Sequence, residues 1–564
     1  MTPSVLDGVG VGTAGAVGPV IRFRVESGVP ADEAVPVGAE QVEAAVALAS
    51  QSLEAVADDL TTAATRHGGT ALGEVLVATA EIARDPVLAE RISDQIGTGM
   101  GPAAAVQAVF DDYASTFAEL GGYMAERVAD LHSVSKRVVA RICGRPVPDL
   151  SVLPGPAIIV AQELTPADTA AMDVPNVLGI ITAQGGATSH TAIIARQLDI
   201  ACVVGVHGAL EIPEDSTVAI QSHKGTVVVD PPETLITEIK QRNERRSRLL
   251  VGDWPGATSD GDRIELLCNI GGPSELDTLP KEPEGVGLFR TEFLFLDAET
   301  APSVTEQTAI YSQVFDGLAG RKVVLRTLDA GSDKPLAFAN RTVEPNPALG
   351  VRGYRLGSAS PQLLDTQLAA VAQAGRANPA TDVWVMAPMI STAQEAAEFA
   401  TRARTHGLSK VGVMIEVPAA ALCSGQILEY VDFVSIGTND LAQYTMAADR
   451  LSSALVDLLD PWQPAALELV ARVAEGATRA AKPVGVCGES ASDPLMALVL
   501  KGMGITSLSM SAPAIPVVKM ALSRTSAQQC RSLARAALTA RSAIEARSAV
   551  VAGLDPEARD LILG

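Results

Sequence analysis

The sequence predicts an α/β multidomain protein in which a compact α/β domain carries an inserted helical bundle and is followed by a C-terminal (β/α)8 TIM barrel. The length of 564 residues is enough for three or four domains. An apolar content of 47% supplies large cores. The hydrophobic periodicity is helical between residues 30 and 143 and changes after residue 150 to short β-branched runs. These observations together predict the order of the domains.

The first part of the sequence predicts two domains, one of which is inserted into the sequence of the other. Residues 1–20 alternate small and apolar residues with glycines, as short strands and turns do. Segments such as QVEAAVALASQSLEAVADDLTTAATR repeat apolar residues at i, i+3, i+4 and i+7, which indicates amphipathic helices. The later runs PAIIVA, VLGIIT, ACVVGV, TVAI and GTVVVD indicate strands. We therefore expect an α/β domain at 1–20 and 146–230, with a bundle inserted at 21–145.

The second part of the chain predicts a barrel. After Pro231-Pro232, the charged stretch ETLITEIKQRNERRSRLL indicates a solvated helix within a linker at 231–260. Eight strand candidates follow, IELLCNI, GVGLFR, VVLRTLD, VWVMAPM, VGVMIE, FVSIGT, VGVCGE and SLSMS, most of them separated by enough residues for a helix. Eight βα units over residues 261–564 match the size of a TIM barrel.

The amino-acid composition limits the classes of partner that we expect the protein to bind and the cellular compartment in which we expect it. With 66 acidic residues against 43 Lys and Arg, the chain has a formal net charge of −23, which argues against nucleic-acid binding. The six cysteines are scattered without a CxxC pair, so we expect neither disulfides nor a zinc site. The N-terminus lacks the basic segment of a signal peptide, and no apolar run is long enough to span a membrane. We expect a cytoplasmic protein.

The acidic excess is concentrated in the predicted bundle. Between Pro30 and Ser135 there are 17 acidic residues and four arginines. One interpretation is a solvated helix face. The other is a surface that steers a carrier protein with positive charge around its own reactive residue, in which case association slows as salt rises.

Polar side chains stand where the predicted barrel strands end, which is the face on which TIM barrels place their active sites. They are Arg290, Arg326, Glu416, Asn439, Asp440 and Cys487, and Arg450 follows ten residues after Asp440. Arginines on adjacent strands favour an anionic substrate, because the guanidinium binds phosphate or carboxylate oxygens through two donors. Glu416 and Asp440 form a carboxylate pair that is either a salt-bridge network or, with substrate oxygens, a Mg²⁺ site.

Two further residues indicate covalent or proton chemistry. Cys487 is either a core thiol or, because Gly485 and Gly488 flank it, an open thiol that exchanges a proton with carbon. His190 follows Gly185 and Gly186 in GGATSHTAIIARQL, where Thr188 or Ser189 can cap a helix. It is either a structural histidine or a nucleophile whose phosphate would lie near the helix N-terminus.

At these residues the sequence resembles the phosphoenolpyruvate-utilising enzymes, and within them the enzyme I group of the bacterial sugar phosphotransferase system. The resemblance covers essentially the whole chain. The segments that carry it, in the family's order, are GGATSHTAIIAR, EGVGLFRTEFLF, NPALGVRGYR, GVMIEVPAA, FVSIGTNDLAQYTMAADR, VCGESA and GMGITSLSMS.

The resemblance implies a phosphoenolpyruvate–protein phosphotransferase. His190 would take the phosphoryl group from phosphoenolpyruvate and pass it to a histidine of the carrier HPr, which would dock on the acidic helical domain. Cys487 would protonate the enolate to give pyruvate. Thr165 matches a threonine that hydrogen-bonds the active histidine. Substrate would be bound by Arg290, Arg326, Asn439, Asp440 and Arg450, and Mg²⁺ by Glu416 and Asp440.

The resemblance also implies assembly and motion. A homodimer through the barrel is expected, as is a swivel of the phosphohistidine domain between substrate and carrier. Two alternatives stay open. One is an enzyme like pyruvate phosphate dikinase or phosphoenolpyruvate synthase, although no Gly-rich ATP loop is evident in the helical segment. The other is a catalytically silent regulatory protein.

Overall fold

The chain forms two compact units, residues 1–245 and residues 246–563, each of which is considered by itself. This computed structural model describes residues 4–563 apart from 12–14, 25–27, 31–32, 67–70, 121–126, 146–149, 151–152, 166–167, 170–171, 187–188, 199, 251–255, 280–282, 297, 299, 332–335, 337, 339–343, 345 and 450–452. Across that part of the chain, the structure contains no helix with the length and apolar character of a membrane span.

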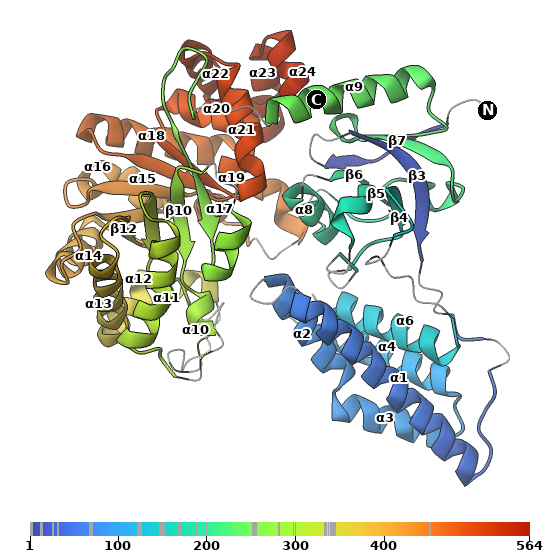
Figure 1. Ribbon diagram of the computed structural model, residues 1–564. Helices are drawn as coiled ribbons and strands as arrows, with labels where there is room; N and C mark the ends of the chain where they lie inside the picture. The colour runs from blue at the N-terminus through green and yellow to red at the C-terminus, as the bar shows by residue number, and fades with distance from the viewer. Residues whose placement is uncertain are drawn as a thin grey trace. The chain divides into compact units, whose positions relative to one another are not determined.

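The first unit is built on an eight-stranded mixed sheet with the order β1-β8-β7-β3-β4-β5-β6-β2 (Figure 1). β3 pairs parallel with β4 and antiparallel with β7, so the N-terminal strands complete the α/β domain as predicted. β3 extends to Phe23, beyond the expected end of the segment at residue 20. The strands are β1 (Ser4–Asp7), β2 (Val9–Val11), β3 (Gly15–Phe23), β4 (Ala157–Ala161), β5 (Val177–Thr182), β6 (Ala201–Val204), β7 (Thr217–Gln221) and β8 (Thr226–Val229).

A helical bundle is inserted between β3 and β4, in agreement with the helical periodicity of that segment (Figure 1). Its buried core includes Leu76, Ile92 and Phe110, each 2% exposed or less. Glu33 fixes the start of α4, because its carboxylate accepts from the Ala103 and Ala104 amides at 2.7 and 3.1 Å. The helices are α1 (Ala39–Arg66), α2 (Ala71–Ala83), α3 (Pro86–Gly97), α4 (Pro102–Leu120) and α6 (Val128–Ile142).

Two helices outside the bundle belong to the α/β domain and its connection. α8 (His190–Gln197) follows the Gly185-Gly186 turn, and α9 (Glu233–Leu250) occupies the charged stretch predicted as a connecting helix. Asn243 ties α9 to the sheet, since its amide donates to the Gly15 carbonyl at 2.8 Å. Residues 233–250 of the expected linker are thus helical.

The second unit is a closed parallel barrel, as the eight strand candidates predicted (Figure 1). The strands are β9 (Glu265–Ile270), β10 (Gly285–Arg290), β11 (Lys322–Arg326), β12 (Asp382–Ala387), β13 (Val411–Ile415), β14 (Phe433–Gly437), β15 (Val484–Cys487) and β16 (Ser507–Met510). The barrel closes where β16 pairs with β9, for example Leu508 with Leu266. The strands share a large apolar core with the surrounding helices, and a smaller apolar cluster on the strands includes Leu288, Val324 and Met414.

Helices connect the strands and extend beyond the last one. Several begin with strong caps: Ser303 and Thr392 each form a reciprocal capping box with a glutamate three residues later. The helices are α10 (Phe293–Leu296), α11 (Val304–Gly317), α12 (Tyr354–Ala359), α13 (Pro361–Ala377), α14 (Ala393–Thr405), α15 (Pro418–Leu422), α16 (Ser424–Ile427), α17 (Thr438–Met446), α18 (Pro464–Ala480), α19 (Glu489–Ser492), α20 (Pro494–Met503), α21 (Ile515–Ser523), α22 (Ala527–Leu538), α23 (Ala543–Gly553) and α24 (Pro556–Leu563).

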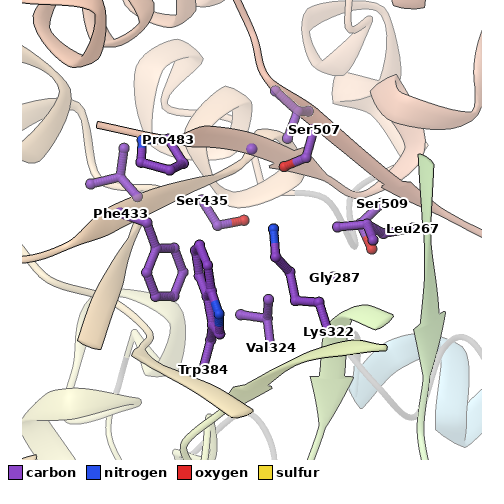
Figure 2. Close-up of a pocket in the computed structure, with 13 residues that line it drawn as sticks. Leu267, Gly287, Lys322, Val324, Trp384, Phe433, Ser435, Pro483, Ser507 and Ser509 are labelled. Carbon is purple, nitrogen blue, oxygen red and sulfur yellow. The ribbon is translucent and has the colours of Figure 1, made fainter. Parts of the chain in front are cut away.

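A pocket lies toward the strand starts of the barrel, opposite the end where the predicted site residues stand. Figure 2 shows Lys322 reaching into this pocket beside Trp384. The Lys322 ammonium lies 4.2 Å from the indole centroid and pairs with Glu265 at 2.5 Å. The side chain therefore closes the bottom of the barrel through a cation–π contact and an ion pair. Residues at the strand-start end of a TIM barrel contribute to stability rather than to catalysis.

Candidate active site

The barrel strands and the first turn of α17 place five predicted site residues at one rim. Arg290 and Arg326 are paired partners at the ends of β10 and β11. Cys487, at the end of β15, is paired with Gly437 at the end of β14. Asn439 and Asp440 follow in the first turn of α17, where Asn439 is exposed and Asp440 is buried. Because parallel strands end on the same edge, residues more than 190 positions apart in sequence meet there.

Arg326 is buried within a set of carboxylates. Its guanidinium forms an ion pair with Glu292 and lies 3.1 Å from Asp329 Oδ2, and Arg326 is only 7% exposed. The nearby carboxylates of Glu292 and Asp329 raise the pKa of Arg326, against the opposing effect of burial. Arg290, by contrast, is exposed at the end of its strand. Arg326 is thus held in place by ion pairs, whereas the exposed Arg290 can contact a bound solute.

Arg352, which sequence reasoning did not assign to the site, connects the carboxylates of the rim. Its guanidinium lies 3.1 Å from Asp329 Oδ2 and 3.2 Å from Asp440 Oδ1, and the residue is 1% exposed. Tyr444 is a further neighbour, with its hydroxyl 3.5 Å from Arg352 Nη1. A signal was present in the sequence, because Asp329 ends the strand candidate VVLRTLD and Arg352 lies in NPALGVRGYR, one of the segments that carry the resemblance.

Glu416 is a buried carboxylate with one oxygen available. Oε1 accepts from the Met389 amide at 2.6 Å, whereas Oε2 is buried without a hydrogen-bond partner. Burial raises the pKa of Glu416, and the carboxylates of Asp440 and Asp329 raise it further while Arg326 opposes them. A buried carboxyl group with one unpartnered oxygen is suited to bind a cation, because the cation would provide the missing contact to Oε2.

Glu416 Oε2 lies so close to residue 437 that only glycine fits there. A Cβ at Gly437 would lie 2.6 Å from Glu416 Oε2. Among the described residues, no group of three or more His, Cys, Asp or Glu side chains is placed to hold a metal. Glu416 and Asp440 supply two carboxylates, and Mg²⁺ is commonly bound by one or two carboxylates together with substrate oxygens and water.

Cys487 is a protonated thiol at neutral pH. Burial raises its pKa and Glu416 adds to the increase, while the Ser435 hydrogen bond, Arg326 and Arg290 oppose it. The Ser435 hydroxyl donates to Sγ at 3.5 Å, and the thiol itself donates to the Ile436 carbonyl at 3.5 Å. The residue is only 2% exposed and packs in an apolar cluster with Leu288 and Met414, so the open position suggested by the flanking glycines is wrong. A thiol that keeps its proton can act as a general acid.

The second predicted site begins α8 in the first unit. His190 is the first residue of that helix, and its side chain lies outside the described part of the structure. Gly185 adopts a φ of +97°, so the predicted tight turn needs glycine there. Ser189 caps the helix, because its hydroxyl accepts from the Ala192 amide at 3.4 Å.

The structure thus places the barrel residues together and describes only part of the remainder. Arg290, Arg326, Glu416, Asn439, Asp440 and Cys487 all stand at the strand ends of one barrel, while Arg450 lies outside the described residues. Glu292, Asp329, Arg352 and Ser435 join them without having been assigned from the sequence. They were missed because their contacts with the predicted site residues come from tertiary packing, which a strand pattern does not report.

Three family models match consecutive parts of the chain. The models are the PEP-utilising enzyme N-terminal domain at residues 5–127, the mobile domain at 153–225 and the PEP-binding domain at 246–527. Their order agrees with the bundle, the α/β domain and the barrel described above.

Curated relatives match nearly from end to end. A phosphoenolpyruvate-protein phosphotransferase of Streptomyces coelicolor is 45% identical over 95% of this chain and 96% of its own length. Proteins of the same name from Haloferax volcanii and Bacillus subtilis are 37% and 34% identical, over 96% and 86% of this chain and 98% and 88% of their own lengths. With this coverage and the three matching domains, the chain belongs to the PEP-utilising enzyme family and, within it, to the phosphoenolpyruvate-protein phosphotransferases.

Proposed function

We propose that this protein takes the phosphoryl group of phosphoenolpyruvate onto His190, passes it to a histidine of HPr and releases pyruvate, as the first step of sugar uptake by a phosphotransferase system. The observation that carries the proposal is the barrel rim, where arginines, two carboxylates and a protonated thiol converge. Each group matches a separate requirement of that reaction.

The substrate carries a phosphate and a carboxylate, and both are anions that guanidinium groups bind. Arg290 is exposed at the rim and Arg326 is fixed beside it, so one can adapt to the substrate while the other positions it. Asn439 and Arg450 are proposed to complete the contacts. Charge on the transferring phosphoryl oxygens would be compensated by these donors.

Mg²⁺ is proposed as the cofactor, held by Glu416 and Asp440. It would neutralise phosphate charge during transfer. The unpartnered Oε2 of Glu416 supports this assignment, because a buried carboxylate oxygen without a hydrogen bond is costly unless a cation meets it. Arg352 would keep Asp440 in place through its contact with Oδ1.

Cys487 is proposed to finish the reaction. Loss of the phosphoryl group leaves the enolate of pyruvate, whose methylene carbon must gain a proton. The Cys487 Sγ–H bond would break as the C–H bond forms, and the thiolate would then regain a proton from solvent. Because its pKa is raised, the thiol still holds this proton before the proton is transferred to carbon.

His190 is proposed as the phosphoryl acceptor, with the swivel of its α/β domain linking substrate and carrier. The carrier is proposed to bind the helical segment at 21–145. Two arginines there are paired with carboxylates, Arg84 with Asp58 at 2.7 Å and Arg91 with Asp112 at 2.7 Å. The remaining acidic side chains would attract a basic partner, so the association rate with HPr should fall as salt rises. A barrel-mediated homodimer and a cytoplasmic location complete the proposal.

The test is transfer of label from phosphoenolpyruvate with Mg²⁺, followed by chase to purified HPr. Wild type and the exposed control His207→Ala should form an acid-labile phosphoprotein and lose the label to HPr with release of pyruvate. His190→Ala should accept no label. Label on His190→Ala would refute the acceptor, and absence of turnover with any carrier would favour a regulatory protein.

A further inference from the structure

The Cys487 thiol lies inside the barrel, with a hydroxyl group directed at its sulfur. The residue packs among apolar side chains such as Met414 and is only 2% exposed, so bulk water barely reaches the sulfur. The Ser435 hydroxyl donates to Sγ at 3.5 Å, and Ser435 is itself 6% exposed. A proton that leaves the thiol during turnover must return before the next cycle, and Ser435 is placed to return it.

Ser435 also lines the pocket that begins at the strand starts. It is the third residue of β14, so the pocket extends from the first residues of the strands, such as Ser507, to the middle of the barrel. Successive side chains of a strand alternate between its two faces, so Gly485 and Cys487 lie on the same face of β15. Because Gly485 lines the pocket, Cys487 follows directly after the pocket in the direction of the rim.

The pocket has room for a water molecule beside Gly485. A Cβ at Gly485 would lie 2.6 Å from Ser507 Oγ and 3.9 Å from Ser435 Oγ, so the space in front of this glycine adjoins both hydroxyls. The cavity volume is about 20 Å³, and roughly 10–15 Å³ is needed to hold one water. Gly485 and Ser507 are both partly exposed, so solvent reaches this space.

The pocket is also polar enough to hold water. In Figure 2 the Ser435 and Ser507 hydroxyls and the Lys322 ammonium point toward the same space. A water molecule there would meet three polar groups, and about two to four are needed. The ammonium pairs with Glu265 at 2.5 Å and has further protons to donate. Its positive charge would also stabilise a hydroxide ion formed in the pocket.

We propose that Ser435 is a positioning residue that restores the proton of Cys487 from water held in this pocket. After the thiol has given its proton to carbon, the Ser435 O–H bond breaks as a new S–H bond forms on the thiolate. The water gives a proton to the Ser435 oxygen, and the resulting hydroxide exchanges into bulk solvent. This inference rests on the proposed role of Cys487 as proton donor and adds the route by which its proton returns.

Successive turnovers of the full-length protein separate this role from a structural one. In rapid-quench measurements of pyruvate formation with Mg²⁺ and excess HPr, the first turnover uses a proton that is already on the thiol. Later turnovers need a new one. Ser435→Ala should keep the first-turnover rate and slow later turnovers by about tenfold, which is less than the roughly 10²-fold or greater loss caused by removing a general acid. Ser435→Thr keeps the hydroxyl and should restore the later turnovers.

A second variant fills the pocket and leaves the Ser435 hydroxyl in place. Gly485→Ala is combined with Ser507→Ala, which removes the oxygen that the new Cβ would meet at 2.6 Å. This double variant should also slow the later turnovers selectively. Ser507→Ala alone leaves the space open and should slow them less than the double variant does.

The ratio of the first to the later turnover rates decides the outcome. An unchanged ratio in Ser435→Ala would overturn the inference even if both rates fell, since a structural defect slows every turnover. A wild-type ratio in the folded double variant would overturn the route through the pocket. Wild-type turnover of Cys487→Ala would instead refute the proposed role of the thiol, so the two failures are distinguishable.

Discussion

Arg352 and Asp440 form a buried ion pair inside the barrel, with guanidinium Nη1 3.2 Å from carboxylate Oδ1. The same guanidinium contacts Asp329 at 3.1 Å. One side chain from the segment after β11 thus compensates two carboxylates, one of which is a proposed metal ligand on α17. The Mg²⁺ position would therefore depend on an arginine that is not itself at a strand end.

Replacing Arg352 should destabilise the barrel strongly. Arg352→Ala leaves Asp329 and Asp440 buried without their shared counter-ion, and we expect a loss of about 3–5 kcal/mol in the free energy of unfolding. Arg352→Lys keeps the charge and should lose less. Urea unfolding followed by fluorescence of the barrel residues Trp384 and Trp462 measures the difference. Equal stability of the alanine variant and wild type would contradict the pairing.

Adding one methyl group at Gly437 should disable the cation site while leaving the barrel folded. The added Cβ would come within 2.6 Å of Glu416 Oε2, and the rise in melting temperature caused by Mg²⁺ should disappear. Gly425→Ala is a matched control, since its Cβ would meet nothing within 4 Å. Retention of the full Mg²⁺ shift in Gly437→Ala would argue that the ion binds elsewhere.

Glu416→Gln should separate metal binding from stability. The substitution replaces a buried carboxyl group, whose pKa is raised and whose Oε2 has no partner, with an amide of the same shape, so the metal-free protein should be about as stable as wild type. Its Mg²⁺-dependent gain in stability should be lost. Thermal unfolding with and without Mg²⁺ gives both quantities, and a strongly destabilised metal-free variant would show that Glu416 has a structural role.

Cys487→Ala should slow pyruvate formation by about 10²–10⁴-fold, the usual contribution of a positioned general acid. Cys423→Ala, at an exposed thiol between α15 and α16, should turn over like wild type. Pyruvate release coupled to HPr phosphorylation provides the measurement. Wild-type turnover in the Cys487 variant would assign the proton to another donor.

Acid should loosen the contact between α13 and α14. Arg402 binds Asp365 through two contacts of 2.6 and 2.8 Å, and this pairing, with help from His406, lowers the pKa of Asp365 to about 2. A lowered carboxyl pKa contributes stability that is complete above the unfolded value near 4 and is lost as pH falls toward 2.

Because the pair is partly exposed, we expect that contribution to be only about 1 kcal/mol. Asp365→Asn should therefore destabilise the barrel slightly at pH 7, and its stability should depend less on pH between 4 and 2. The difference between wild-type and variant unfolding free energies across that range is the measurement. A difference that does not change with pH would exclude the ion pair as its source.

The sequence by itself determined the domain order and most of the rim. Strand candidates separated by helix-length segments specify a barrel, and a strand end is a local property, so Arg290, Arg326, Glu416, Asp440 and Cys487 could be selected from the printed residues. The helical insertion was equally visible, because a change of hydrophobic period is local.

Only the tertiary structure decided which charges meet. Arg352 lies 88 residues before Asp440, and no periodicity links them until the barrel closes. The contact of Arg137 with Asp168 likewise requires a helix of the bundle to pack beside the α/β domain. Two charged groups pair only when they lie within a few ångströms of each other in space. A sequence pattern indicates only which face of a single helix or strand is buried. The positions of the reactive groups are thus apparent from the sequence, and the side chains that orient them emerge from packing.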